Sequence, residues 1–239
     1  MSVPRVHVVL VRPQNPANIG AVARVMRNTG LQSLRLVQPG DWRRTECWRS
    51  AWGAHDVLEQ ARESVDLQAA LAGAAWGAAF SGQVESHHRT LDVRELATRA
   101  ARLDAGQEAC LVFGPESSGL TRGEIAVCGL RVRIPSHPAQ PSLNLSHAVM
   151  VAGYEILRAC ESGGVSSGPP CATHDDKERL LTLWRQALED LRALPPQRAE
   201  AAFGEWRALL LRLDLTTREL RLLEHAAHRL LTRRPPEAG

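Results

Sequence analysis

The sequence predicts an α/β domain with a mostly parallel sheet, followed by a small all-helical C-terminal extension. Short apolar runs rich in β-branched residues alternate with helical patterns as far as residue 160, and such alternation places the strands parallel because each helix returns the chain to the same edge of the sheet. A segment rich in Gly, Ser and Pro, SGGVSSGPPCAT, then interrupts the chain, and leucines recur at helical spacing beyond it. We therefore expect an α/β domain over residues 1–161, a linker over 162–174 and a helical extension over 175–239.

The first elements predict a parallel βαβ unit. Val6 to Val11 is a continuous apolar run and therefore a buried strand, which ends at Arg12-Pro13. A loop rich in Pro and Asn leads into a helix from about Ile19 to Asn28, and Gly30 is its stop signal. Ser33 to Val37 is the second strand.

The middle of the chain continues this alternation. Asp41 to Gly53 is predicted to be a connection whose three tryptophans pack under a loop rather than stack on bases. Residues 81–91, SGQVESHHRTL, are expected to form a polar loop. Helices are expected at His55 to Arg62, Asp66 to Leu71 and Val93 to Leu103, and strands at Ala74 to Phe80, Ala109 to Phe113 and Arg131 to Ile134.

The last strand leads into residues 135–155, PSHPAQPSLNLSHAVMVAGYE. Its prolines fix a loop, and Ser142, Asn144 and Ser146 crowd the start of a helix. Apolar residues cover most of the circumference of that helix, so we expect it to be packed on several sides. In the extension, three helices are expected over 175–194, 198–213 and 217–233, and Thr216 or Thr217 followed by Glu219 predicts an N-cap for the last.

The composition limits the function classes. The formal net charge of the 239 residues is +3, from 29 basic and 26 acidic side chains, so a nucleic-acid site has to come from local clustering of charge. Only Lys177 among the basic residues is a lysine; arginine usage suits an RNA or DNA partner and equally a coding bias. Five widely spaced cysteines without a CxxC pair or zinc spacing predict reduced thiols, and no run reaches membrane length. We expect a cytoplasmic protein without a membrane segment.

Three polar loops follow three buried strands: residues 15–24, 113–120 and 135–155. The carboxyl ends of parallel strands share one edge of a sheet, so these loops are candidates for a single ligand site. Each taken alone has an ordinary interpretation as a helix cap or a tight turn. The sequence contains no GxGxxG, GxxxxGKS, GxSxG or HExxH pattern, and His87-His88 without a third ligand predicts a surface pair and no metal.

Three segments follow one another in the order NPANIGAVAR, LVFGPESSGL and IPSHPAQPSLNLSHAVMVAGYE. Together they resemble the three motifs of the SpoU/TrmH branch of the SPOUT RNA methyltransferases, and the resemblance covers residues 5–160. The downstream helices look like the C-terminal extension of the TrmJ group, which methylates tRNA at the ribose 2′-hydroxyl of position 32, a cytidine or uridine. The resemblance implies the SPOUT fold with a C-terminal trefoil knot, S-adenosylmethionine as methyl donor, and a homodimer whose active sites are shared between protomers.

The resemblance also assigns residues. The cofactor would be lined by Ser81, Gly82, Gly114, Glu116, Ile134 and Leu143, and the catalytic side would be formed by Asn18, Arg24, Ser142 and Asn144. An arginine normally stays protonated, so we expect Arg24 to orient the hydroxyl and stabilise oxyanion charge, without a metal. Asn144 and Ser142 would position ribose or cofactor through neutral hydrogen bonds. Glu116 would interact with the positive charge of the cofactor or with Arg24.

One region departs from the pattern of the family. The strand ending at Phe80 is followed by SGQVESHHRTL, in which Arg89-Thr90-Leu91 is retained but His87 stands where a second arginine is common. Three alternatives therefore stay open. The substrate could be ribosomal RNA or another tRNA position, or the chain could be an RNA-binding homologue that has lost catalysis.

Overall fold

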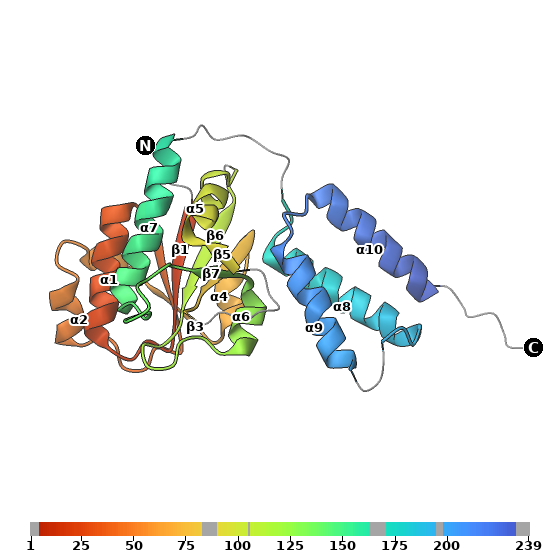
Figure 1. The fold of residues 1–239 in the computed structure, drawn as a ribbon, viewed down its shortest axis with the longest axis horizontal. Coiled ribbons are helices and arrows are strands. Elements are labelled where there is room, and N and C mark those ends of the chain that lie inside the picture. The colour runs from red at the N-terminus through yellow and green to blue at the C-terminus, as the bar shows by residue number, and fades with distance from the viewer. Residues whose placement is uncertain (1–4, 83–89, 105, 163–170, 195–197, 233–239) are drawn as a thin grey trace, which may run out of the picture.

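The structure, a computed structural model, describes residues 5–82, 90–104, 106–162, 171–194 and 198–232. Within them seven strands form one sheet in the order β3-β2-β1-β6-β4-β7-β5, and every recorded strand pair is parallel (Figure 1). The strands are β1 (Arg5–Val11), β2 (Ser33–Val37), β3 (Arg62–Ser64), β4 (Trp76–Phe80), β5 (Thr90–Asp92), β6 (Glu108–Phe113) and β7 (Gly129–Arg133). The predicted parallel α/β sheet is confirmed.

Side chains alternate between the two faces of this sheet, and helices cover both. In β1, Val6, Val8 and Leu10 pack into one core, while Val9 and Val11 pack into the other. The first core is closed by α1 (Pro16–Thr29), α2 (Thr45–Ser50), α3 (His55–Glu59), α5 (Val93–Ala101) and α7 (Leu145–Ser162). The second is closed by α4 (Leu67–Leu71) and α6 (Arg122–Cys128). This sandwich holds the carboxyl ends of the strands in fixed positions.

The helix α1 begins three residues earlier than the sequence pattern indicates. The Asn15 side chain accepts a hydrogen bond from the backbone N of Ala17 at 2.9 Å, and Pro16 occupies the first turn. Proline lacks an N–H that the first turn would leave unpaired, so the Pro/Asn segment is the start of the helix rather than a loop before it. Gly30 ends the helix with a φ of 75°, as expected.

Four short elements were not expected from the sequence: α2, β3, β5 and α6. β3 and β5 have three residues each, are only partly buried and lie at the two edges of the sheet, so their sequences lack the apolar pattern that marks a central strand. The prediction that residues 41–53 form only a connection was wrong because it contains α2. Two of its tryptophans differ in exposure: Trp42 is buried, whereas Trp52 is 73% exposed.

The helix α7 packs on α1 and α5 with one side only. Val149 and Ile156 are buried, but Met150 is 38% exposed and Tyr154 51% exposed. The expectation that this helix is packed on several sides was therefore wrong for the single chain. Its apolar surface is wider than the two neighbouring helices cover, which leaves an apolar strip at the surface.

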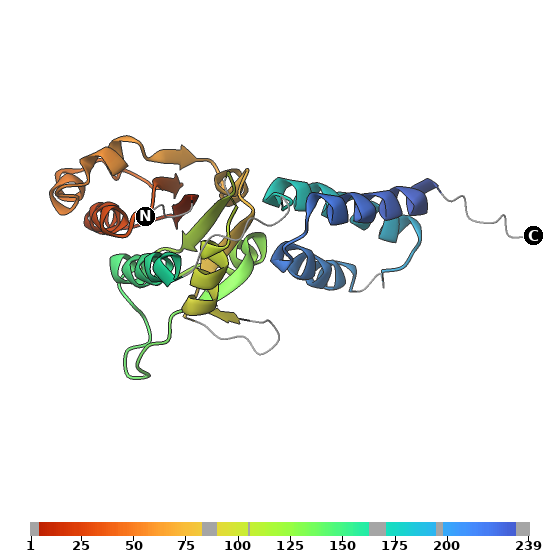
Figure 2. The same ribbon diagram turned by 90° about the horizontal axis from the view of Figure 1, so that it is seen from above.

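The three helices expected in the extension are confirmed as α8 (His174–Asp190), α9 (Ala199–Arg212) and α10 (Thr217–Thr232). They bury a core of their own around Leu180, Phe203 and Leu211. The backbone N of Thr216 donates to Glu219 at 2.8 Å, which confirms the expected cap. Figures 1 and 2 show these helices on one side of the sheet domain, with α1, α2 and α7 on the opposite side.

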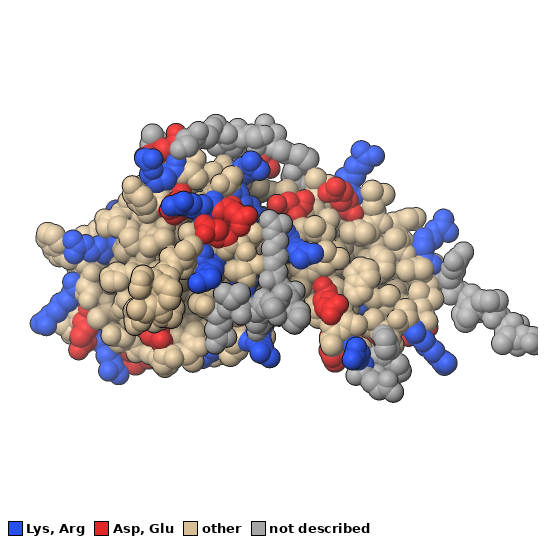
Figure 3. All heavy atoms as spheres, in the orientation of Figure 1, with Lys and Arg blue, Asp and Glu red and all other residues tan. Residues whose placement is uncertain are grey.

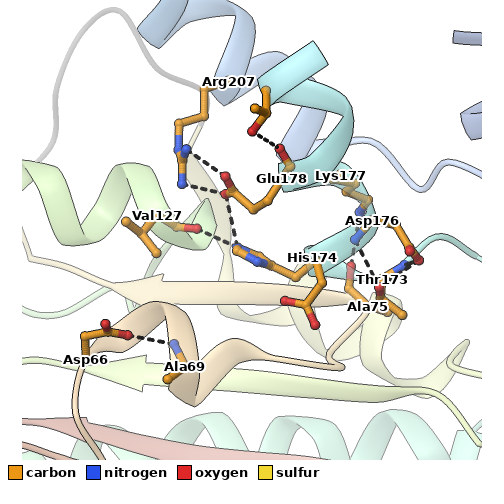
Figure 4. A network of polar contacts seen from close by, with 12 residues as sticks. Asp66, Ala69, Ala75, Val127, Thr173, His174, Asp176, Lys177, Glu178 and Arg207 are labelled. Atoms are coloured by element: carbon orange, nitrogen blue, oxygen red, sulfur yellow. Dashed lines mark hydrogen bonds and ion pairs between the residues drawn. The ribbon is translucent and has the colours of Figure 1, made fainter. Parts of the chain in front are cut away.

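Main-chain acceptors join the start of α8 to the sheet domain (Figure 4). The backbone N of His174 donates to the carbonyl of Ala74 at 2.6 Å, and its Nε2 donates to the carbonyl of Val127 at 2.8 Å. Lys177 is 1% exposed and its Nζ donates to the carbonyl of Ala75 at 3.0 Å. Burial lowers the pKa of Lys177 to about 8, against the opposing effect of the Asp214 carboxylate.

The described helices include none that is both long and apolar enough to span a bilayer. On the face drawn in Figure 3, basic and acidic side chains are intermixed rather than gathered in one basic patch. The threading of the knot and the domain boundaries at 161 and 174 stay predictions.

Candidate active site

The candidate site lies where four neighbouring strands end. The sheet order contains β1, β6, β4 and β7 side by side. The loop after β1 leads to Asn18, the loop after β6 carries Glu116, β4 is followed by Ser81, and β7 is followed by the segment that reaches Asn144. The strand ends thus bring together segments that are far apart in the sequence.

A chain of hydrogen bonds joins the three loops. Glu116 Oε1 accepts from Asn18 Nδ2 at 2.8 Å, and Asn18 Oδ1 accepts from Asn144 Nδ2 at 3.2 Å. Asn144 Oδ1 in turn accepts from the backbone N of Ser146 at 2.9 Å and from its hydroxyl at 2.8 Å. The predicted convergence of the three loops is therefore confirmed.

The polarity of this chain is set at one end. An ionised carboxylate only accepts hydrogen bonds, so Glu116 fixes the amide of Asn18 with its NH₂ group facing the carboxylate. The Asn18 oxygen must then face Asn144, which turns the NH₂ group of Asn144 toward it. One carboxylate thus orients two amide side chains on two other loops.

The main chain holds Glu116 in its ionised form. The backbone N of Gln14 donates to Oε2 at 3.0 Å and that of Asn15 to Oε1 at 3.3 Å. Burial alone would raise the pKa of Glu116, but the hydrogen bonds from Asn18 and from these amides lower it below its ordinary value. The site therefore carries a negative charge at neutral pH.

The loop around Glu116 requires two glycines. A Cβ on Gly114 would lie 2.4 Å from the carbonyl carbon of Gly119, so a side chain there is excluded by backbone. Gly119 has a φ of 67°, a conformation that L side chains rarely adopt. The loop consequently folds back on itself and projects Glu116 toward Gln14 and Asn18.

Two predicted catalytic residues stand apart from this chain. Arg24 lies on an exposed part of α1, and its guanidinium carbon is 5.9 Å from the centre of the Trp52 ring. Ser142 is exposed, and its hydroxyl accepts from Gln140 Nε2 at 3.4 Å. Neither has a recorded hydrogen bond to Glu116, Asn18 or Asn144 within the described residues. Their roles stay predictions.

The residues expected to line a cofactor follow β4, β6 and β7. The backbone N of Ser81 donates to the carbonyl of Val132 at 3.1 Å, which ties the end of β4 to β7. Ile134 is half-buried against the core, while Gly82 and Leu143 are exposed. His87, His88 and Arg89 lie outside the described residues. In the ranges that are described, no three His, Cys, Asp or Glu side chains gather as a metal site.

The sequence analysis missed the main-chain donors of Gln14 and Asn15. Pro13 and Pro16 flank them, and prolines cannot donate a backbone hydrogen bond. Within residues 13–16, only Gln14 and Asn15 have backbone N–H groups to offer to Glu116. This spacing was the available signal.

Comparisons with known proteins agree with this geometry. Residues 5–154 match the model of the SpoU rRNA Methylase family. A Pseudomonas aeruginosa protein, tRNA (cytidine/uridine/adenosine-2′-O-)-methyltransferase TrmJ, is 34% identical, with 92% of this chain and 91% of that protein covered. The crystal structure of TrmJ from Z. mobilis ZM4 superposes with a TM-score of 0.81 at 29% identity, covering 97% of this chain and all of the other.

A more distant neighbour bears on the fold alone. The SpoU methyltransferase AviRb from Streptomyces viridochromogenes, solved with the cofactor AdoMet, has a TM-score of 0.51 at 22% identity and covers 68% of this chain and 63% of its own. The family match covers well over half of the chain, and the TrmJ likeness extends through the helical extension. This chain belongs to the SpoU rRNA methylase family.

Proposed function

We propose that the protein transfers a methyl group from S-adenosylmethionine to the ribose 2′-hydroxyl of tRNA, at a cytidine or uridine of position 32. The observation that carries the proposal is the chain from Glu116 through Asn18 to Asn144, which unites all three motif loops at one edge of the sheet. The likeness to the P. aeruginosa tRNA methyltransferase supports the substrate class. Residues 1–161 would perform the transfer, and the extension over 175–239 would help to hold tRNA.

The residues present suit this cofactor. S-adenosylmethionine, when bound, supplies a methyl group already activated by a positively charged sulfonium. The ionised Glu116 would favour that charge, and the main chain around Gly114, Ile134 and Leu143 would bind its polar ends. The match of residues 5–154 to a methylase family supports a methyl donor of this kind.

The remaining task of the protein is to hold a ribose hydroxyl in line for the transfer. Asn18 and Asn144 would position the ribose or the cofactor, because Glu116 fixes their amides in one orientation. Ser142 would add a hydroxyl contact. Arg24 would orient the 2′-oxygen and stabilise the charge that develops as its proton leaves.

A homodimer would complete the site. Leu143, Met150 and Tyr154 are exposed large apolar residues on α7 and the segment before it, and such a strip favours contact with a second copy. Arg24 and Trp52 are also exposed. We infer that each active site is shared, with Arg24 reaching the ribose held by the loops of the partner subunit. The five cysteines form no disulfide with one another, which suits a cytoplasmic protein.

Ribosomal RNA is the second candidate substrate, because the matching family model describes rRNA methylases. Another tRNA position and a non-catalytic RNA-binding role also remain to be separated from the main proposal. Incubation with labelled S-adenosylmethionine and unmodified bulk tRNA or rRNA, followed by nucleoside analysis, separates them. We expect 2′-O-methylated cytidine or uridine from tRNA. Label in rRNA alone would refute the tRNA assignment, and failure to bind the cofactor would favour the non-catalytic role.

Arg24→Ala tests the catalytic assignment. The side chain is exposed and has no recorded hydrogen bond or ion pair within the described residues, so we expect the free energy of unfolding and the cofactor affinity to stay near wild type. Methyl transfer should fall by a factor of about 100 or more, as for other lost charge-stabilising donors. Single-turnover methylation measures this. Wild-type turnover by the variant would refute the role.

A further inference from the structure

A second pocket adjoins the candidate site, beyond the ends of β1 and β2. It has a volume of about 480 Å³, which lies within the range of small-molecule sites. Its lining residues include Arg12, Gln14, Ile19, Gln38, Trp42 and Arg44. None of these belongs to the residues assigned above to cofactor or catalysis.

Backbone strain is concentrated at this pocket. Of the described residues, three other than glycine have a positive φ, and two of them are Arg12 at 45° and Gln38 at 48°. Each directly follows the last residue of a strand, and the backbone N of Arg12 donates to the carbonyl of Val37 at 2.8 Å, so the two turns lie side by side. Glycine would adopt these turns without strain, so the presence of side chains at both positions indicates that the side chains are used.

The charges lining the pocket are balanced. Both guanidinium nitrogens of Arg12 bind the Glu124 carboxylate, one of them at 3.1 Å. Arg44 Nε donates to Asp41 at 3.0 Å. Two paired arginines offer flat surfaces without a net positive charge, and the nearly fully buried Ile19 and Trp42 form an apolar wall behind them. This environment suits a neutral aromatic ring better than a phosphate group.

Two amide groups provide a donor and an acceptor. Gln14 Oε1 accepts from the backbone N of Ser117 at 3.3 Å, and Gln38 Nε2 donates to the carbonyl of Val65 at 3.1 Å. These partners fix both amide orientations, and no recorded bond within the described residues uses Gln14 Nε2 or Gln38 Oε1. A nucleobase is a neutral ring whose edge carries an acceptor beside a donor, so it matches these two amide groups.

We propose that this pocket receives one unstacked base of the RNA substrate and determines which nucleotide is presented for methylation. The backbone N of Gln14 binds Glu116 at 3.0 Å, so a base held here lies directly beside the predicted ribose site. The inference rests on the proposed function in taking RNA as the substrate. It adds a specificity pocket formed by the ends of β1 and β2.

Gln38→Gly tests the pocket, because it removes the acceptor and relaxes the backbone at a φ of 48°. We expect unchanged or higher thermal stability, unchanged S-adenosylmethionine affinity by calorimetry, and tRNA affinity weakened by about tenfold in filter binding, the loss typical of one base-edge contact. Gln14→Ala should act in the same direction. Gln60→Gly, which removes another exposed amide without touching the pocket, is the matched control and should bind tRNA as wild type does.

The occupying base is identified with tRNAs that lack the base at the methylated nucleotide or at either neighbour. The difference between wild type and Gln38→Gly should disappear for one of these abasic RNAs. Equal tRNA affinity of the two proteins would overturn the inference, as would a loss of cofactor affinity in place of tRNA affinity. A wild type that binds tRNA through Gln38 but methylates none of it would refute the proposed function and leave the pocket standing.

Discussion

Asn144 serves the helix and the site with opposite ends of one amide. Its oxygen accepts from the backbone N of Ser146 and so caps α7, while its NH₂ group donates to Asn18. Helix start and site geometry are therefore coupled at a single side chain. A substitution that keeps the capping oxygen but replaces the NH₂ group separates the role of Asn144 in the helix from its role in the site.

Asn144→Asp keeps the capping oxygen and places an acceptor opposite the Asn18 oxygen. We expect the free energy of unfolding in urea to stay within about 0.5 kcal/mol of wild type, while methyl transfer falls because the amide chain is broken. Asn144→Ala is the comparison, and should lose about 1 kcal/mol of stability as well because it also lacks the cap. Full activity of the Asp variant would show that the direction of the hydrogen bonds from Glu116 to Asn144 does not matter for methyl transfer.

The titration of Lys177 should make the stability of the protein depend on pH. Its folded pKa of about 8 lies below the ordinary value of 10.5, so between these two values the unfolded chain binds more protons. The stability contributed by this group therefore rises with pH across that window, by about 3 kcal/mol in total. Urea denaturation at pH 7.5 and pH 10 should show the wild type gaining about 2 kcal/mol of this total relative to Lys177→Met. A constant difference between the two proteins would contradict the burial of a charged amine.

At the residue level the sequence predicts those participants whose chemistry is carried by the side chain. Asn18, Glu116 and Asn144 are distinctive residue types in polar loops after strands, and the structure unites them. The amides of Gln14 and Asn15 were not predicted: Pro13 and Pro16 limit the main-chain donors of this segment to these two residues, but do not show that they face Glu116. Only the conformation of the loop decides which amides face a carboxylate.

Among the contacts between secondary-structure elements, the one between β7 and α9 depends on a single glycine. Gly129 begins β7 with a φ of 79°, and a Cβ built on it would lie 2.4 Å from the Cβ of Leu211. The extension therefore sits directly on the backbone of the sheet domain at this point. Its docking excludes any side chain there.

Gly129→Ala should destabilise the protein by about 2–4 kcal/mol, because α9 has to move and the alanine has to adopt a positive φ. Gly53→Ala is the matched control: its φ is 77° and nothing lies within 4 Å of the added Cβ. The difference between the two variants in chemical denaturation isolates the contact with Leu211. Equal losses would mean that the contact contributes nothing.

The sequence predicts long or strongly apolar elements and misses short polar ones. β1 and β6 are largely buried apolar runs, and α8, α9 and α10 are long, with 17, 14 and 16 residues. β3 has the sequence RES, and only its hydrogen bonds to β2 make it a strand. Such an element is fixed by its neighbours rather than by its own propensity.

The whole molecule presents two unlike sides. The extension occupies one side of the sheet domain, and α7 with its exposed apolar strip lies on the other (Figures 1 and 2). Pairing of two chains through α7 would therefore leave both extensions free to approach RNA. The sequence did not reveal this division, because the periodicity of α7 shows which residues are apolar but not which of them a neighbour covers.

Tyr154→Glu tests the proposed dimer. A charge at this half-exposed position should convert a dimer into a monomer in light scattering, with a loss of methyl transfer if the sites are shared. Leu222→Glu places the same charge at a 64% exposed leucine of α10 and should leave the assembly unchanged. A Tyr154→Glu protein that remains dimeric would place the interface elsewhere.

The attachment of α8 to the sheet domain has an evolutionary consequence. His174 and Lys177 reach the carbonyls of Ala74, Ala75 and Val127, and a carbonyl is present whatever the side chain at its position. The sheet domain can therefore change these three residues, within the limits of packing, and keep its half of the attachment. The extension attaches through the side chains of His174 and Lys177, which cannot be replaced in the same way. Substitutions should therefore be tolerated at the three positions of the sheet domain and selected against at these two positions of the extension.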